Sequence, residues 1–124
     1  MKRYFWDTSA IILLLQGDER LTKYAKYPGL TSSLNVLELA VWLRHAGVRK
    51  DVSIVAEGFT VLECVPTDLI NKIEEVRYEL RRKTGRKVSY IDAIGYILAR
   101  ENNAIFLTAD GAFKDVEGAE YINP

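Results

Sequence analysis

With 124 residues, 48% of them hydrophobic, the chain is long enough to bury the core of one domain, and we expect residues 1–124 to form a single domain. Lys and Arg number 17 and so do Asp and Glu, so the zero net charge argues against a protein that holds nucleic acid by overall charge. A single cysteine, Cys64, excludes an intramolecular disulfide and a cysteine-based zinc site. No apolar run approaches the roughly 20 residues of a membrane span, and we expect a soluble, cytoplasmic protein.

The first third of the sequence predicts two strands and three helices. In chain order they are a strand over 3–7, a helix over 9–16, a second helix over 18–26, a strand over 30–32 and a helix ending near Ala46. Glycine or Pro-Gly follows each helix, as expected where helices stop. Ser32 or Ser33 is the expected N-cap of the last helix. On that helix Leu34, Leu37 and Val41 predict an apolar face that Glu38 shares.

The remainder alternates helices and strands. The expected elements are a short helix over 51–57, a strand over 60–65, a long helix over 67–83 capped by Thr67, a helix over 89–102 opened by Ser89, a strand over 104–108 and an edge strand over 120–122. Cys64 falls in the apolar strand and is expected in the core. Alternation of this kind predicts an α/β fold with a parallel sheet of four to five strands covered by helices on both faces.

Four acids stand at or near the edges of apolar segments. Asp7 closes the run Tyr4-Phe5-Trp6, and Asp110 follows the last core strand. Glu38 and Asp92 fall in the first turns of two helices. If the two strands are neighbours, all four carboxylates can meet at the carboxyl edge of the sheet, where ligands bind in such folds.

Clustered carboxylates repel one another, and the arrangement persists best around a divalent cation. Oxygen-only ligands suit Mg²⁺ or Mn²⁺, so the sequence predicts metal-assisted chemistry on a phosphodiester. Simpler interpretations exist for each acid: Asp7 as a helix cap, Glu38 as a surface acid, Asp92 as the second half of a capping box with Ser89, and Asp110 as a turn residue. His45 is the only histidine, which excludes RNA cleavage by a histidine pair.

A basic segment precedes the helix that carries Asp92. It contains five cations and no acid: Arg81, Arg82, Lys83, Arg86 and Lys87. A solvated helix end is the simpler interpretation. Because the segment leads into the acidic cluster, we expect it to contact the phosphates of a polyanion.

The ordered motifs resemble the PIN-domain nucleases, in particular the VapC-type toxins. The matching segments are 5–9, Thr31-Ser32 with 38–40, 89–93 and 107–110, together with the ending 113–118. The resemblance implies a three-layer α/β/α sandwich, a homodimer, a cognate antitoxin and Mg²⁺- or Mn²⁺-dependent cleavage of RNA. It also carries over the acidic quartet Asp7, Glu38, Asp92 and Asp110, with supporting hydroxyls at Thr8 or Ser9 and Thr108.

On this hypothesis Asp7, Asp92 and Asp110 hold the cation, and Glu38 orients or deprotonates a water. Many members of the family carry a further acid where this chain has Ala112, and Asp115 is three residues further on. Two alternatives remain: a receiver-type phosphoacceptor domain, although Trp6 precedes a lone Asp7 and no lysine follows the last core strand, and a catalytically silent PIN scaffold for protein binding.

Overall fold

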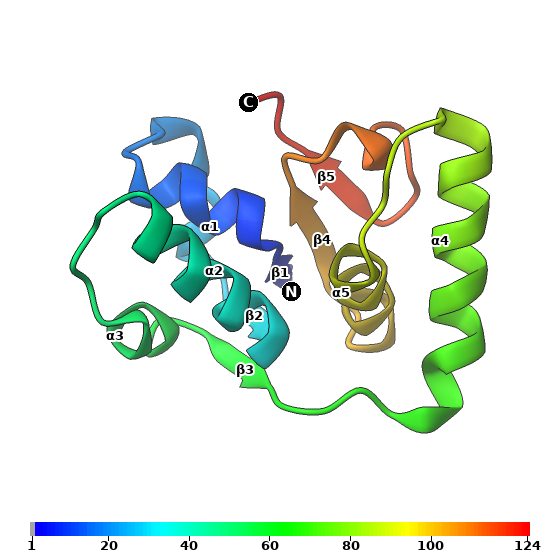
Figure 1. Ribbon diagram of the computed structural model, residues 1–124, viewed down its shortest axis with the longest axis horizontal. Helices are drawn as coiled ribbons and strands as arrows, with labels where there is room; N and C mark the ends of the chain where they lie inside the picture. The colour runs from blue at the N-terminus through cyan, green and yellow to red at the C-terminus, as the bar shows by residue number, and fades with distance from the viewer. Residues whose placement is uncertain (1) are drawn as a thin grey trace.

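The computed structural model describes residues 2–124, which build a five-stranded sheet. The strands are β1 (Tyr4–Trp6), β2 (Gly29–Ser32), β3 (Thr60–Leu62), β4 (Ile105–Thr108) and β5 (Ala119–Tyr121). All neighbouring pairs are parallel, and the order across the sheet is β3-β2-β1-β4-β5 (Figure 1). The predicted parallel sheet is therefore confirmed, with the last strand at an edge.

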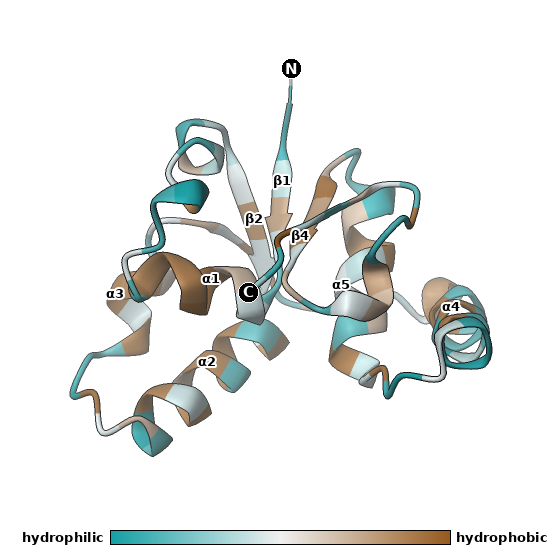
Figure 2. Ribbon diagram, turned by 90° about the horizontal axis from the view of Figure 1, so that it is seen from above, coloured by the Kyte–Doolittle hydropathy of each residue, from teal (hydrophilic) through white to brown (hydrophobic). Residues whose placement is uncertain are grey.

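Helices cover both faces of the sheet. On one side lie α1 (Thr8–Leu15), α2 (Ser33–His45) and α3 (Val52–Ala56), and on the other lie α4 (Ile70–Thr84) and α5 (Tyr90–Glu101) (Figure 2). Side chains of β1 alternate between the two resulting cores: Phe5 packs with the α4–α5 side, and Tyr4 and Trp6 pack with the α1–α2 side. The result is the expected three-layer α/β/α sandwich.

Helix α5 packs unusually close to the sheet because it carries Gly95. A Cβ at that position would lie 3.0 Å from the rings of both Phe5 and Phe106. The close approach holds the first turn of α5 beside the carboxyl ends of β1 and β4, which is where Asp92 is carried.

Capping side chains begin the helices as the sequence predicts. Ser32 accepts from the amide of Asn35 at the start of α2, and Ser89 accepts from the amide of Asp92 at the start of α5. Asp7 caps α1 by accepting from the amide of Thr8 at 2.9 Å. The simpler interpretation of Asp7 as a cap is thus correct, and it does not prevent a second role for its carboxylate.

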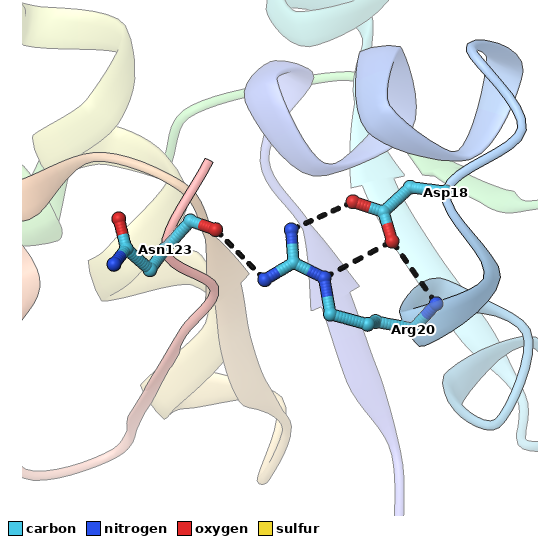
Figure 3. A network of polar contacts seen from close by, with 3 residues as sticks. All are labelled: Asp18, Arg20 and Asn123. Atoms are coloured by element: carbon cyan, nitrogen blue, oxygen red, sulfur yellow. Dashed lines mark hydrogen bonds and ion pairs between the residues drawn. The ribbon is translucent and has the colours of Figure 1, made fainter.

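The helix predicted over 18–26 is wrong. This segment forms two 3₁₀ turns, Glu19–Leu21 and Tyr24–Lys26, because the Asp18 side chain accepts from the amide of Arg20 and closes a tighter turn. The Asp18 carboxylate also accepts from Arg20 Nε at 3.1 Å and Nη2 at 2.7 Å, while Nη1 donates to the Asn123 carbonyl at 2.8 Å (Figure 3). Arg20 thus links Asn123, near the C-terminus, to Asp18 in the segment that follows α1.

The predicted apolar face of α2 is also wrong. Leu37 and Val41 are 60% and 50% exposed, and the buried residues are Asn35, Leu39 and Leu43. Apolar side chains occupy most positions around this helix, so its sequence pattern does not single out one face.

The strand predicted over 60–65 ends at Leu62, and Cys64, expected in the core, lies exposed beyond it. As an edge strand β3 is paired on one side only, and the chain leaves it early. The prediction of Thr67 as a helix cap is wrong: Thr67 is the first residue of a 3₁₀ turn, Thr67–Leu69, and α4 begins at Ile70 without a side-chain cap. Across residues 2–124, every helix is too short or too polar to cross a bilayer.

Candidate active site

The acids meet where the strand order reverses. From β1 the chain proceeds outward to β2 and β3, then returns across the sheet to β4 on the other side of β1. The carboxyl ends of β1 and β4 therefore flank the point at which open α/β sheets bind ligands. Asp7 follows β1, Asp110 follows β4, and the Asp7 amide donates to the Leu107 carbonyl at 2.9 Å.

A cleft of about 290 Å³ opens at this point. The four acids line it, together with the hydroxyl residues Thr8 and Ser9 and the apolar side chains of Ile12 and Trp42. Within residues 2–124 the lining includes no basic side chain. A larger depression of about 610 Å³ lies beside the carboxyl end of α2, but none of the four acids reaches it. The smaller cleft is therefore the candidate active site.

Asp7 is the buried centre of the cleft, at 2% exposure. Its Oδ2 accepts from Thr108 Oγ1 at 2.7 Å and from Ser9 Oγ at 2.9 Å. Its Oδ1 accepts from the Thr8 amide at 2.9 Å and from Asn35 Nδ2 at 3.3 Å. Burial raises the pKa of Asp7 to about 6, and the hydroxyl and amide donors hold it below the value that burial alone would give.

Ser9 and Thr108 connect Asp7 to the turn that carries Asp110. Besides donating to Asp7, Ser9 Oγ accepts from the Ala109 amide at 2.9 Å, and Thr108 Oγ1 accepts from the Asp110 amide at 3.0 Å. Each hydroxyl thus donates its one proton to Asp7 and accepts a hydrogen bond from a backbone amide of residues 109–110. The predicted supporting hydroxyls lie in the site, and they fix the distance between two of the acids.

Thr8 and Asn35 orient the fourth acid. Thr8 Oγ1 donates to Glu38 Oε1 at 2.7 Å and accepts from Asn35 Nδ2 at 3.1 Å. Asn35 Oδ1 accepts from Ser32 Oγ at 2.6 Å, so the wholly buried Asn35 amide has partners on both sides. Sequence reasoning missed Asn35. The sequence signal that could have found it is its spacing: Asn35 stands four residues before Leu39 and eight before Leu43, on the same face of the helix.

Asp92 and Asp110 form a close pair on the other side of the cleft. The pKa of Asp92 is raised to about 8, chiefly by burial, then by the charge of Asp7 and by a hydrogen bond with Asp110. The hydrogen bond favours the protonated carboxyl because only that form can donate to Asp110. At neutral pH a proton therefore offsets part of the mutual repulsion. Asp110 Oδ1 also accepts from the Ala112 amide at 2.9 Å.

The donor set fits a hard divalent cation. Carboxylate and hydroxyl oxygens surround the cleft, and burial, with a smaller contribution from the neighbouring acids, raises the pKa of Asp7 and Asp92. Within residues 2–124, no three acidic, histidine or cysteine side chains are gathered closely enough to form a ready-made metal cluster. A cation that binds to Asp92 would displace its proton, because a carboxylate ligand binds in its ionised form.

The other predicted residues lie outside the cleft. Arg81, Arg82 and Lys83 are in the last turn of α4, and Arg86 and Lys87 are in the loop to α5, all exposed. Arg82 Nη2 donates to Glu79 Oε2 at 2.7 Å. Ala112 is wholly buried, and Asp115 lines a separate depression beside Lys83 and Lys114. Asp115 therefore does not replace the acid that many relatives carry at the position of Ala112.

Several solved structures of known proteins share this fold. A toxin–antitoxin complex from Klebsiella pneumoniae superposes with a TM-score of 0.75 at 17% identity, covering 96% of this chain and 99% of that one. VapC20 of Mycobacterium tuberculosis, described as a sarcin-ricin loop cleaving toxin, gives 0.67 at 26% identity, covering 98% and 99%. VapBC2 from Rickettsia felis, bound to a DNA fragment from its promoter, gives 0.68 at 18% identity, covering 97% of each chain.

Comparison with curated proteins gave no significant match. The family model described as "PIN domain" matches residues 4–119, from β1 to the start of β5 and including all four acids. The chain therefore belongs to the PIN-domain family.

Proposed function

We propose that this protein is a Mg²⁺- or Mn²⁺-dependent endoribonuclease and the toxin of a toxin–antitoxin pair. The observation that carries the proposal is the meeting of Asp7, Glu38, Asp92 and Asp110 in one cleft at the topological switch point. The PIN-domain match supports nuclease chemistry, and the description of VapC20 as a sarcin-ricin loop cleaving toxin supports RNA as the substrate.

Asp7, Asp92 and Asp110 would hold the cation. When bound, a divalent ion supplies positive charge at the scissile phosphate and lowers the pKa of a water. Asp7 is fixed by its four donors, and the Asp110 turn is tied to it through Ser9 and Thr108. The chain therefore contributes a preorganised set of oxygens, of which only the Asp92 carboxyl must first lose a proton.

Glu38 is the residue that orients the attacking water and accepts its proton. Its Oε1 accepts from the Thr8 hydroxyl, and Glu38 lines the cleft. Attack by water needs no participation of the ribose 2′-hydroxyl. The expected products carry 5′-phosphate and 3′-hydroxyl ends, and a 2′,3′-cyclic phosphate would contradict this mechanism.

The basic segment would hold the RNA backbone. Its members, Arg81, Arg82, Lys83, Arg86 and Lys87, are exposed beside the helix that carries Asp92. With zero net charge on the chain, affinity for RNA must come from such a local concentration of cations.

A cognate antitoxin and a homodimer complete the proposal. Solved structures of similar fold are described as a toxin–antitoxin complex, as VapBC2 and as FitAcB from Neisseria gonorrhoeae, which supports a protein partner for this chain. The antitoxin would cover the acidic cleft with a basic side chain, since the cleft lining within residues 2–124 supplies none. Both proteins would act in the cytoplasm, where the RNA is.

The receiver-type alternative loses support from the strand order. Receivers have the flavodoxin-like order 2-1-3-4-5, whereas this sheet has β1 in its centre with β2 and β4 on either side. Among the residues that line the cleft, none is a lysine, which receivers need. A silent PIN scaffold remains as the second candidate.

Cleavage of labelled single-stranded RNAs with Mn²⁺, Mg²⁺ or EDTA tests the proposal. We expect cation-dependent cutting by the native chain, a loss of at least a hundredfold in Asp92→Asn, and native activity in Asp68→Asn, an exposed acid that makes the same charge change outside the cleft. Equal cutting by the native chain and Asp92→Asn would overturn the site. No cutting of any RNA, including a sarcin-ricin loop hairpin, would favour the silent scaffold.

A further inference from the structure

Within the basic segment, Arg86 lies against Gly111, the residue that follows Asp110 of the acidic cleft. A Cβ built on Gly111 would lie 2.8 Å from Nη1, 2.9 Å from Cζ and 3.2 Å from Nη2 of Arg86. Three such similar distances mean that the flat face of the guanidinium covers the glycine. Gly111 directly follows Asp110, so the cation stands one residue from a carboxylate that lines the cleft.

The guanidinium of Arg86 keeps its hydrogen-bonding capacity. Within residues 2–124 its N–H groups have no hydrogen-bond acceptor and no ion-pair partner within 4 Å, whereas Arg82 is engaged with Glu79. The N–H groups of a guanidinium lie in its plane, so packing of its face on Gly111 leaves its five donors available to a ligand. An arginine that is placed but unpaired is suited to bind a phosphate in the two-pronged manner that guanidinium groups allow.

Gly111 is the residue that makes this placement possible. Its φ is not in the left-handed region, so the backbone there does not require glycine. A Cβ at this position would instead force the guanidinium of Arg86 to move from its present place. The absence of a side chain at Gly111 therefore leaves room for the guanidinium of Arg86.

We propose that Arg86, seated on Gly111, binds the RNA phosphate adjacent to the one that is cut and so sets the register of the strand in the cleft. This inference rests on the proposed nuclease function and identifies one subsite of it. The remaining cations of the segment would attract RNA by their charge, whereas Arg86 would hold one phosphate at a fixed place.

Arg100 provides a matched control. It is exposed, it carries the same charge, and its guanidinium also lies against a glycine, Gly118. It stands in the last turn of α5, eight residues after Asp92, which puts it about 12 Å farther along the helix axis. Removal of either arginine deletes one charge, but only Arg86 neighbours the cleft.

Binding and cleavage are measured separately. The Kd of a fluorescein-labelled single-stranded RNA is measured in the uncleaving Asp92→Asn background over a salt series, and kcat and KM are measured in the native background. For Arg86→Ala we expect Kd and KM to rise five- to tenfold, while kcat changes by less than threefold. The plot of the logarithm of the association constant against the logarithm of the salt concentration should become less steep by about 0.7. For Arg100→Ala we expect less than a twofold change, and for Arg86→Lys partial rescue, because charge is kept but the fork is lost.

A double-mutant cycle tests the role of Gly111. Gly111→Ala keeps the charge of Arg86 but displaces it, so we expect a three- to tenfold rise in Kd. The double variant with Arg86→Ala should bind no more weakly than Arg86→Ala alone, because the collision has been removed. If the increases in Kd of Gly111→Ala and Arg86→Ala multiply in the double variant, Gly111 does not act through Arg86. Equal increases in Kd for Arg86→Ala and Arg100→Ala would overturn the phosphate subsite at Arg86. Failure of the native chain to cut RNA would instead overturn the nuclease function, while the Kd comparison still decides the role of Arg86.

Discussion

Thr108 Oγ1 donates to Asp7 Oδ2 at 2.7 Å and accepts from the Asp110 amide at 3.0 Å, so one buried hydroxyl joins the carboxyl ends of β1 and β4. Thr108 does not itself line the cleft and is wholly buried beneath it. Its function is to hold two acids that are 103 positions apart in the sequence at a fixed separation.

Thr108→Val keeps the shape of the side chain and removes the hydroxyl. The Asp110 amide then loses its acceptor and buried Asp7 loses one donor, which should cost about 1–3 kcal/mol of the free energy of unfolding. We also expect weaker binding of Mn²⁺, because the Asp110 turn is no longer tied to Asp7. Chemical denaturation and Mn²⁺ titration measure the two effects. Thr22→Val, which removes an exposed hydroxyl bonded to the Glu19 carbonyl, is the control and should change little.

Asn35→Ala should be among the most damaging single changes near the site. It removes the donors to Asp7 and Thr8 and the acceptor for Ser32, all in a buried region. We expect a loss of about 2–4 kcal/mol in the free energy of unfolding, against less than about 0.5 kcal/mol for the exposed Asn71→Ala in α4. Similar losses for the two variants would show that the Asn35 network contributes nothing to stability.

Asp92→Asn should stabilise the metal-free protein increasingly as pH rises. The folded state holds the Asp92 proton up to a pKa of about 8, whereas the unfolded chain releases it near 3.8. Between these values the folded state binds more protons, so the native free energy of unfolding falls with pH and levels off above about 8. Asparagine does not titrate and can donate to Asp110 as the protonated carboxyl does.

We therefore expect the Tm of Asp92→Asn to exceed that of the native chain by at least about 4 °C more at pH 8.5 than at pH 5, measured in EDTA. The same substitution should reduce the rise in Tm that Mg²⁺ produces in the native chain. Asp68→Asn, in an exposed 3₁₀ turn, should show no such widening. A variant that melts below the native chain at both pH values would mean that Asp92 stabilises α5 more than it repels its neighbours.

The sequence was sufficient to place Asp7 and Asp110, because Asp7 directly follows one apolar run and Asp110 lies three residues after another, and both runs predict buried strands. The adjacency of those strands follows from the right-handed crossovers of a parallel sheet. The N-caps Ser32 and Ser89 fixed the starts of two helices and hence the first-turn positions of Asp92 and, one turn in, Glu38.

The polar interior of the site could not be predicted in the same way. Asn35 is buried only because its amide finds Asp7, Thr8 and Ser32, which come from three separate elements. The seat of Arg86 on Gly111 likewise joins residues from two distant loops. Such contacts depend on tertiary geometry, and no local period in the sequence reports them.

The buried face of α2 can be tested by truncation. Leu39 is 1% exposed, and Leu39→Ala should cost about 2–5 kcal/mol of the free energy of unfolding through lost burial and a cavity. Leu37 is 60% exposed, and Leu37→Ala should cost less than about 0.5 kcal/mol. Both residues are leucines of the same helix, so the difference between the two variants reports which face of α2 is buried. A larger loss for Leu37→Ala than for Leu39→Ala would mean that the face predicted from the sequence pattern is the buried one.

The affinity for Mn²⁺ should rise with pH and then level off. Asp92 must lose its proton to act as a ligand, and below its pKa of about 8 each unit of pH should change the binding constant by about tenfold. Below about 6 the proton on Asp7 adds a second contribution, so the dependence should steepen. Above about 8 both carboxyls are ionised, and the affinity should become independent of pH.

Calorimetric titration in two buffers with different protonation enthalpies measures the protons released. We expect about one proton per Mn²⁺ at pH 7, close to none at pH 9, and weaker binding without that release in Asp92→Asn. Binding at pH 7 that releases no proton would mean that the cation does not replace the proton between Asp92 and Asp110. The ligands would then have to be sought among Asp7, Glu38 and the hydroxyl oxygens of the same cleft.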